Sequence, residues 1–125
     1  MILVDTSVWV DHLRRSNARL VALLDRNEVT CHPFVIGELS LGTLKHRREI
    51  LDLLAELPPA SFVTHDEAMA FVERRSLHGR GIGWVDAHLL ASALLDRRPV
   101  WTLDRRLHAV ARDLDVGWDG RVLSE

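Results

Sequence analysis

Four carboxylate residues are placed along this chain so that folding would bring them toward one site. In order, they are Asp5, Glu38, Asp86 and Asp104. Two follow apolar segments and two interrupt the apolar face of a helical segment, where a carboxylate must be protonated, paired or bound to a metal. No lysine or arginine stands one helical turn from Glu38 or Asp86 as a partner. The four therefore predict a site for Mg²⁺ or Mn²⁺, which prefer oxygen ligands, and with it phosphodiester chemistry.

Short apolar segments alternate with helical segments along the chain. Strands are predicted at Ile2–Val4, Val29–Cys31, Ser61–Val63 and from Pro99 through Leu103. Helices are predicted around Val8, Trp9 and Leu13, around Leu20, Leu23 and Leu24, and at Phe34–Leu41, Glu49–Leu57, Thr64 to about His78, Trp84–Arg97 and Asp104–Leu114. Because the strands are apolar throughout rather than alternating, this order predicts an α/β fold, with helices on both faces of a parallel sheet of four to five strands.

Such a sheet explains how residues far apart in the sequence could meet. In parallel sheets ligands bind beyond the carboxyl ends of the strands, and Asp5 and Asp104 each follow a predicted strand. Glu38 and Asp86 have apolar residues one helical turn away, so both are predicted on buried helix faces. An aspartate after a strand is also a common helix cap, and a small shift in helix phase would expose Glu38 or Asp86. These alternatives stay open from the sequence alone.

Length and composition limit the class of protein. The 125 residues predict one domain, 1–125, and 47% hydrophobic with 27% charged residues is ordinary for a globular protein. A single cysteine, Cys31, excludes an internal disulfide and a thiolate zinc site within one chain. The first residues lack a basic leader, and no stretch has the ~18 apolar residues of a spanning helix, so we expect a cytoplasmic protein without a membrane anchor. The net charge of −2 argues against nucleic-acid binding by bulk charge but leaves room for a local basic patch.

Other segments that could carry chemistry are weaker. Seven histidines lack the spacing of a zinc site and are predicted to be surface or core residues. The glycine-rich segment 78–83 lacks the lysine of a phosphate-binding loop and the spacing of a dinucleotide fingerprint, so it is predicted to be a plain loop. Trp9 and Trp101 are predicted in the core, and Trp84 and Trp118 nearer the surface.

Four segments around the carboxylates resemble the PIN domains, and more narrowly the VapC toxins of bacterial toxin–antitoxin pairs. They are VDTS, GELSLG, GIGWVDAHLLASAL and TLDRRL, and the resemblance covers essentially the whole chain. It implies a PIN-like three-layer α/β/α sandwich and a metal-dependent endoribonuclease. By the same resemblance, the catalytic and metal-binding residues would be Asp5, Glu38, Asp86 and Asp104, holding Mg²⁺ or Mn²⁺, with the hydroxyls of Thr6, Ser7 and Thr102 in support.

The reaction that the resemblance implies is hydrolysis of RNA. A bound divalent ion would lower the pKa of a water, which would then attack phosphorus. The substrate would be a structured RNA such as a tRNA or rRNA loop. The partners would be a VapB-type antitoxin that neutralises the enzyme and a second copy of the chain in a homodimer. Five arginines near the carboxylates could contact RNA phosphates, or be simply solvated: Arg14, Arg15, Arg80, Arg105 and Arg106. The alternative function is a catalytically inactive PIN-like module that binds RNA or protein.

Overall fold

A parallel sheet forms the centre of the computed structural model, which describes residues 1–120. Within these residues it has three strands, β1 (Ile2–Val4), β2 (Val29–Thr30) and β3 (Val100–Trp101), in the order β2-β1-β3. Both neighbours run parallel to β1. Every strand residue is buried, as expected where both faces of a sheet are covered, and this confirms the α/β class predicted from the apolar strands.

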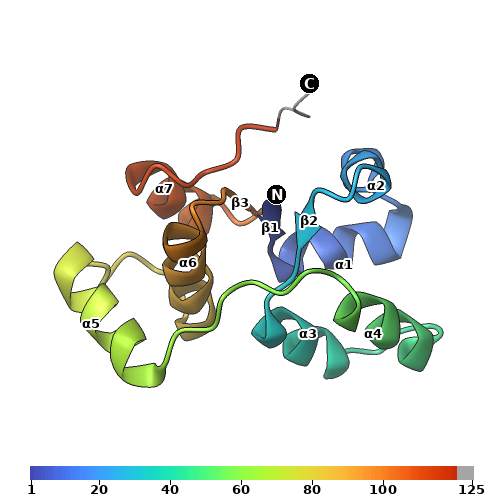
Figure 1. Ribbon diagram of the computed structural model, residues 1–125, viewed down its shortest axis with the longest axis horizontal. Helices are drawn as coiled ribbons and strands as arrows, with labels where there is room; N and C mark the ends of the chain where they lie inside the picture. The colour runs from blue at the N-terminus through green and yellow to red at the C-terminus, as the bar shows by residue number, and fades with distance from the viewer. Residues whose placement is uncertain (121–125) are drawn as a thin grey trace.

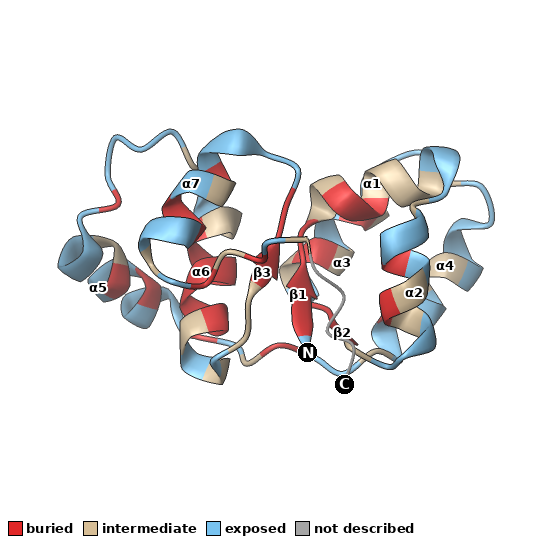
Figure 2. Cartoon of the chain, turned by 90° about the horizontal axis from the view of Figure 1, so that it is seen from above, coloured by how far each residue is buried: buried red, intermediate tan, exposed pale blue. Residues whose placement is uncertain are grey.

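Helices flank the sheet on both sides (Figure 1). One group comprises α1 (Thr6–Arg15), α2 (Ala18–Asp25), α3 (Pro33–Ser40) and α4 (Arg47–Ala55). The other comprises α5 (His65–Arg75), α6 (Trp84–Asp96) and α7 (Arg105–Asp113). The buried residues lie along the strands and the inward helix faces, and α6 is the most buried helix (Figure 2). The predicted three-layer α/β/α architecture is therefore confirmed.

The strand predicted at Ser61–Val63 is absent from the structure. The chain pairs with the sheet slightly earlier, through an isolated parallel bridge between Cys31 and Pro59, and a second bridge joins Val100 to Gly117 on the opposite edge. After the bridge at Pro59, Ser61 bonds to α6 and not to the sheet. Its N–H donates to Asp96 at 2.9 Å, and its carbonyl accepts from a serine of that helix. The sheet thus has three strands, and the two bridges extend its edges where four to five strands were predicted.

Side-chain caps fix several helix ends. The predicted capping box at the start of α5 is present: Thr64 Oγ1 accepts from the Glu67 N–H at 3.1 Å, and Glu67 accepts from the Thr64 N–H at 2.8 Å. That helix ends at Arg75, before the predicted His78, because Ser76 takes a left-handed conformation with φ of 53°. In the described residues no helix is long and apolar enough to cross a membrane.

One aromatic prediction was wrong. Trp9 and Trp101 are buried and Trp84 is 40% exposed, as predicted, but Trp118 is only 6% exposed. Its ring packs on Trp101 with 4.6 Å between the ring centroids, and its backbone N–H donates to the carbonyl of Val100. The pairing of residue 117 with the sheet, which the sequence pattern does not reveal, is what draws Trp118 into the core.

Two buried histidines lie at the junction of α3 and α6. His32 caps α3, since its Nδ1 accepts from the Phe34 N–H at 2.9 Å, and its ring centroid is 6.3 Å from that of His88. Within residues 1–120, Nε2 of His32 and Nδ1 of His88 have no hydrogen-bond partner. Burial, with the neighbouring His88 as the second cause, lowers the pKa of His32 to about 4. The ring is therefore neutral at pH 7.

Acid should destabilise the fold through His32. Its pKa lies near 4 in the folded protein against an ordinary 6.5, so the unfolded chain takes up the proton first. The free energy of unfolding should therefore be highest above pH 6.5 and fall toward pH 4, by about 3 kcal/mol at most. His32→Asn keeps a capping oxygen without the titration, so urea denaturation across this pH range should give a shallower slope. An unchanged slope in His32→Asn would assign the acid sensitivity to other groups.

Candidate metal centre

Asp5 is the most constrained of the four predicted carboxylates. It follows β1, caps α1 and is 6% exposed. Its Oδ2 atom accepts from Ser7 Oγ at 2.7 Å, from Thr102 Oγ1 at 2.7 Å and from the Ser7 N–H at 3.4 Å. Because all three bonds end on Oδ2, the carboxylate is fixed in orientation while Oδ1 is left for another ligand.

The two hydroxyls tie the ends of β1 and β3 together. Ser7 Oγ and Thr102 Oγ1 are 3.2 Å apart, and each also accepts a backbone N–H from the segment after β3. Ser7 accepts from Leu103 at 2.9 Å, and Thr102 accepts from Asp104 at 3.0 Å. These hydroxyls therefore hold Asp5 and the turn that carries Asp104, and their support of a metal site stays a prediction.

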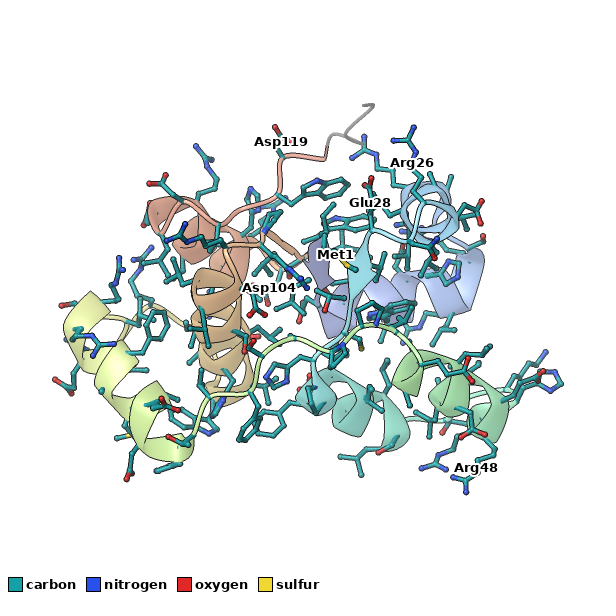
Figure 3. All side chains as sticks on the ribbon, viewed as in Figure 1. Met1, Arg26, Glu28, Arg48, Asp104 and Asp119 are labelled. Atoms are coloured by element: carbon teal, nitrogen blue, oxygen red, sulfur yellow. The ribbon has the colours of Figure 1, made fainter. Side chains whose placement is uncertain are left out.

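Asp104 lies at the end of β3 and caps α7. Its Oδ1 atom accepts from the N–H groups of Arg106 at 2.9 Å and Leu107 at 3.0 Å. Figure 3 shows Asp104 between α6 and the strands, among other oxygen-bearing side chains. Capping and convergence were alternatives for Asp5 and Asp104 from the sequence, and the structure shows that each residue does both.

Glu38 was wrongly predicted on a buried face. It is exposed, because α3 ends at Ser40 and the expected apolar neighbour Leu41 lies beyond the helix, 89% exposed. The buried side of this helix is formed by Val35 and Leu39 instead. Glu38 nevertheless faces the end of β1, since Thr6 Oγ1 donates to its Oε1 at 2.6 Å. The third predicted hydroxyl thus orients the second carboxylate.

Asp86 interacts electrostatically with the other three carboxylates. It is half-buried in the first turn of α6, where its Oδ2 accepts from the Gly83 N–H at 2.9 Å. Burial is the main cause that raises the pKa of Asp86; the Gly83 bond opposes it, and the charges of Asp5, Asp104 and Glu38 raise it further. Since all three charges reach Asp86, the structure gathers the four acidic residues at one rim of the sheet. We refer to these four residues as the carboxylate site.

The donor set of the carboxylate site fits a hydrated divalent ion. All four donors are carboxylates, and in the described residues none of them forms an ion pair with lysine, arginine or histidine. Within residues 1–120, no three histidine, cysteine, aspartate or glutamate residues stand close enough to enclose an ion directly. Mg²⁺ keeps several waters and is commonly bound through one or two carboxylates, whereas a structural zinc ion needs a closed set of nitrogen or sulfur ligands. The open, oxygen-lined rim therefore suits Mg²⁺ or Mn²⁺ rather than zinc.

Two of the five predicted RNA-contacting arginines are already paired. Arg15 Nε lies 2.6 Å from Asp11 Oδ1, one helical turn away on α1. Arg80 Nη2 lies 2.7 Å from Asp113 Oδ2 and so ties the glycine-rich loop to α7. Exposed pairs of this kind are weak, but they compete with any phosphate contact.

The other three arginines border the carboxylate site. Arg106 lies across Gly81, which has a φ of 80°; a Cβ added there would be 2.8 Å from Arg106 Cδ, so the arginine side chain would have to shift. Arg105 lines a shallow cavity with Asp104. Arg14 lines a cavity together with Glu38. Their contact with RNA stays a prediction.

Thr102→Val should show how strongly the hydroxyls hold Asp5. The valine removes a buried donor to a carboxylate at nearly constant shape, so we expect a loss of about 1.5–3 kcal/mol in the free energy of unfolding. Thr30→Val is a matched control, because buried Thr30 Oγ1 donates at 2.6 Å to the neutral carbonyl of Pro58 and should cost about 1 kcal/mol. Urea denaturation measures both. Equal losses would mean that Thr102 acts only as an ordinary buried hydroxyl.

Sequence reasoning missed the loop between α3 and α4. Lys45 and His46 of this loop line the same cavity as Glu38 and Thr6. The available signal was that Lys45 is the sole lysine of the chain, placed shortly after a predicted site residue. His32 was also missed as the cap that orients α3, and hence Glu38.

Known proteins are similar to this chain over nearly its whole length. The PIN domain family matches residues 2–113. Over 117 residues the chain is 55% identical to Ribonuclease VapC32 of two Mycobacterium tuberculosis strains, covering 93% of this chain and 94% of each relative. A structure of FitAB bound to an IR36 DNA fragment has a TM-score of 0.62 and 25% identity, covering 100% of this chain and 99% of that one. The crystal structure of FitAcB from Neisseria gonorrhoeae has a TM-score of 0.63 at 24% identity, covering 94% and 95%, and so shares the fold.

Proposed function

The chain belongs to the PIN-domain family, and from this membership and the carboxylate site we propose that it is an endoribonuclease toxin of the VapC type. The enzyme depends on Mg²⁺ or Mn²⁺ and cleaves a structured RNA, such as a loop of tRNA or rRNA, in the cytoplasm. The convergence of Asp5, Glu38, Asp86 and Asp104 carries the proposal, because helix capping accounts for single aspartates but not for four acidic side chains at one rim.

Each carboxylate would hold the ion through an orientation set by this chain. Asp5 would bind through Oδ1, because Ser7 and Thr102 occupy Oδ2. Thr6 orients Glu38, and the Gly83 N–H orients Asp86. When bound, the divalent ion supplies an activated water and offsets negative charge on the phosphoryl oxygens.

An apolar groove along α1 suits a helix of the antitoxin. It has a volume of about 470 Å³ between α1, α2 and α4, and its lining is mostly apolar, including Trp9, Leu13 and Leu53. Leu53 on the rim of this groove is 59% exposed. We propose that the apolar face of a VapB-type antitoxin helix fills this groove.

The enzyme is also proposed to be a homodimer, which light scattering of the purified protein would test.

An inactive PIN-like binding module is the alternative function. The complete set of four carboxylates weighs against it, since a module that only binds RNA gains nothing from concentrating negative charge at its binding site. Nothing in the fold separates the two functions otherwise, because a site that has lost activity can keep its architecture.

RNA cleavage by the purified, antitoxin-free protein tests the proposal. The protein is incubated with total cellular RNA and Mn²⁺ or Mg²⁺, and the new 5′ ends are sequenced, with a chelator arm in parallel. We expect cleavage at one or a few sites that disappears on chelation. Folded protein without metal-dependent cleavage under either ion would favour the inactive binding module.

A further inference from the structure

A cavity opens directly beside the carboxylate site, between α1, α3 and the loop of residues 41–46. Its volume is about 410 Å³. Thr6 and Glu38 line it on the side of the carboxylate site, Arg14, Lys45 and His46 line it elsewhere, and much of the remaining wall is apolar, formed by Val10, Leu13, Leu39, Leu44 and Ile50. We call it the basic cavity. Because its wall includes a carboxylate of the site, a ligand bound at that site would be adjacent to the cavity.

The loop that brings the basic residues to the cavity is held in place from α4. Nε and Nη2 of Arg47 both donate to the carbonyl of Ser40, at 3.1 and 2.9 Å. The start of the loop continues from α3 through N–H donation by Leu41 and Gly42 to the carbonyls of the preceding turn. These bonds therefore fix both ends of the loop that carries Lys45.

The charges of the basic cavity are available to a ligand. Arg14 and Lys45 are exposed, and neither forms an ion pair within residues 1–120, unlike the neighbouring Arg15. Glu38 is the one acidic residue of the lining, and it is engaged by Thr6. Arg14 and Lys45 thus present two cationic side chains to whatever lies beside the carboxylate site. Its ligand should therefore be anionic.

The backbone of RNA has the matching chemistry, since successive phosphates are separated by a short and regular spacing and each carries one negative charge. A phosphate that meets the carboxylate site would leave the next one along the strand near the cavity wall. The arrangement also limits the repulsion between four carboxylates and an anionic substrate, which the net charge of the chain does nothing to offset.

We propose that the basic cavity binds a backbone phosphate of the RNA next to the one that is cleaved, with Arg14 and Lys45 as its ligands. This subsite rests on the proposed ribonuclease function. It separates binding from chemistry: the carboxylate site acts on one phosphate, and the basic cavity holds the strand. Loss of the cavity charges should therefore raise KM and leave kcat nearly unchanged.

Matched charge variants test the subsite. Lys45→Ala and Arg14→Gln each remove one cation of the cavity, and Arg48→Ala removes an exposed cation that lies on α4 outside the cavity lining (Figure 3). Affinity for a short fluorescein-labelled single-stranded RNA is measured by anisotropy in chelator, over a series of salt concentrations. Each cavity variant should lower the affinity about three- to tenfold and reduce the slope of log affinity against log salt by about 0.7. Arg48→Ala should change neither by a comparable amount.

A cleavage assay of the same proteins with Mn²⁺ separates failure of the subsite from failure of the function. The subsite would be wrong if the wild type cleaves RNA and the cavity variants have the same RNA affinity and KM as Arg48→Ala. The proposed ribonuclease function would then still stand. The cavity variants would also keep the RNA affinity of the wild type if the cavity binds an acidic protein segment, and that result would likewise overturn the phosphate subsite. A wild-type protein that neither binds nor cleaves RNA would overturn the function, and the subsite with it.

Discussion

Asp5→Asn is expected to reduce metal-dependent RNA cleavage by at least about 100- to 1,000-fold in a protein that still folds. Asparagine has the same shape and can accept the hydrogen bonds that Ser7 and Thr102 donate to Oδ2 of Asp5. It carries no charge, however, and cannot bind a divalent ion as a carboxylate does. Single-turnover cleavage of the mapped RNA, with circular dichroism to check folding, measures the effect.

Asp25→Asn is the control for Asp5→Asn. Asp25 is an exposed aspartate at the end of α2, so its substitution removes the same charge without changing the carboxylate site. Its cleavage rate should match the wild type. Wild-type cleavage by folded Asp5→Asn would show that the nuclease activity does not depend on this carboxylate, and the assignment of the site would be wrong.

Asp86→Asn should stabilise the metal-free protein and reduce its stabilisation by metal. The pKa of Asp86 is raised by burial and by three neighbouring carboxylates, so at neutral pH its ionised form is less stable in the folded protein than in the unfolded chain. Asparagine removes that charge and keeps an oxygen to accept the Gly83 N–H. The wild type should gain about 2.7 kcal/mol from Mn²⁺ at about 100 times its Kd, and a variant that binds at least tenfold more weakly should gain about 1.4 kcal/mol or less.

Thermal denaturation of both proteins in chelator and in a series of Mn²⁺ concentrations measures these two effects. The expected pattern is a higher Tm for Asp86→Asn in chelator and a lower Tm than the wild type at saturating Mn²⁺. A crossover of this kind is typical of a functional site that is maintained at the expense of stability. Parallel curves, with equal response to Mn²⁺, would mean that Asp86 does not bind the ion.

The architecture and the four acidic residues could be predicted because their signals are local. An apolar strand followed by aspartate, as at Ile2–Val4 with Asp5, fixes both the element and the residue at its carboxyl end. The Asp86 segment likewise has a long helical pattern, and α6 lies within one residue of the predicted range. Topology then brings these residues to one rim without further information from the sequence.

The errors have tertiary causes. Glu38 was predicted to be buried because Leu41 was counted into the helix, but the chain leaves α3 at Ser40. The strand at Ser61–Val63 was lost to hydrogen bonds with side chains of α6, which no local pattern encodes. The basic cavity is formed by segments from three places in the sequence, so its ligands become visible only in the folded protein.

The most direct test of the account is to measure the affinity of the purified protein for Mn²⁺ by electron paramagnetic resonance, with one variant for each carboxylate. The wild type should bind Mn²⁺, and binding should weaken by about tenfold or more in each of Asp5→Asn, Glu38→Gln, Asp86→Asn and Asp104→Asn, but not in Asp25→Asn. Equal Mn²⁺ affinity in the wild type and all four variants, or no binding by folded wild type, would contradict the claim that these residues form one metal centre.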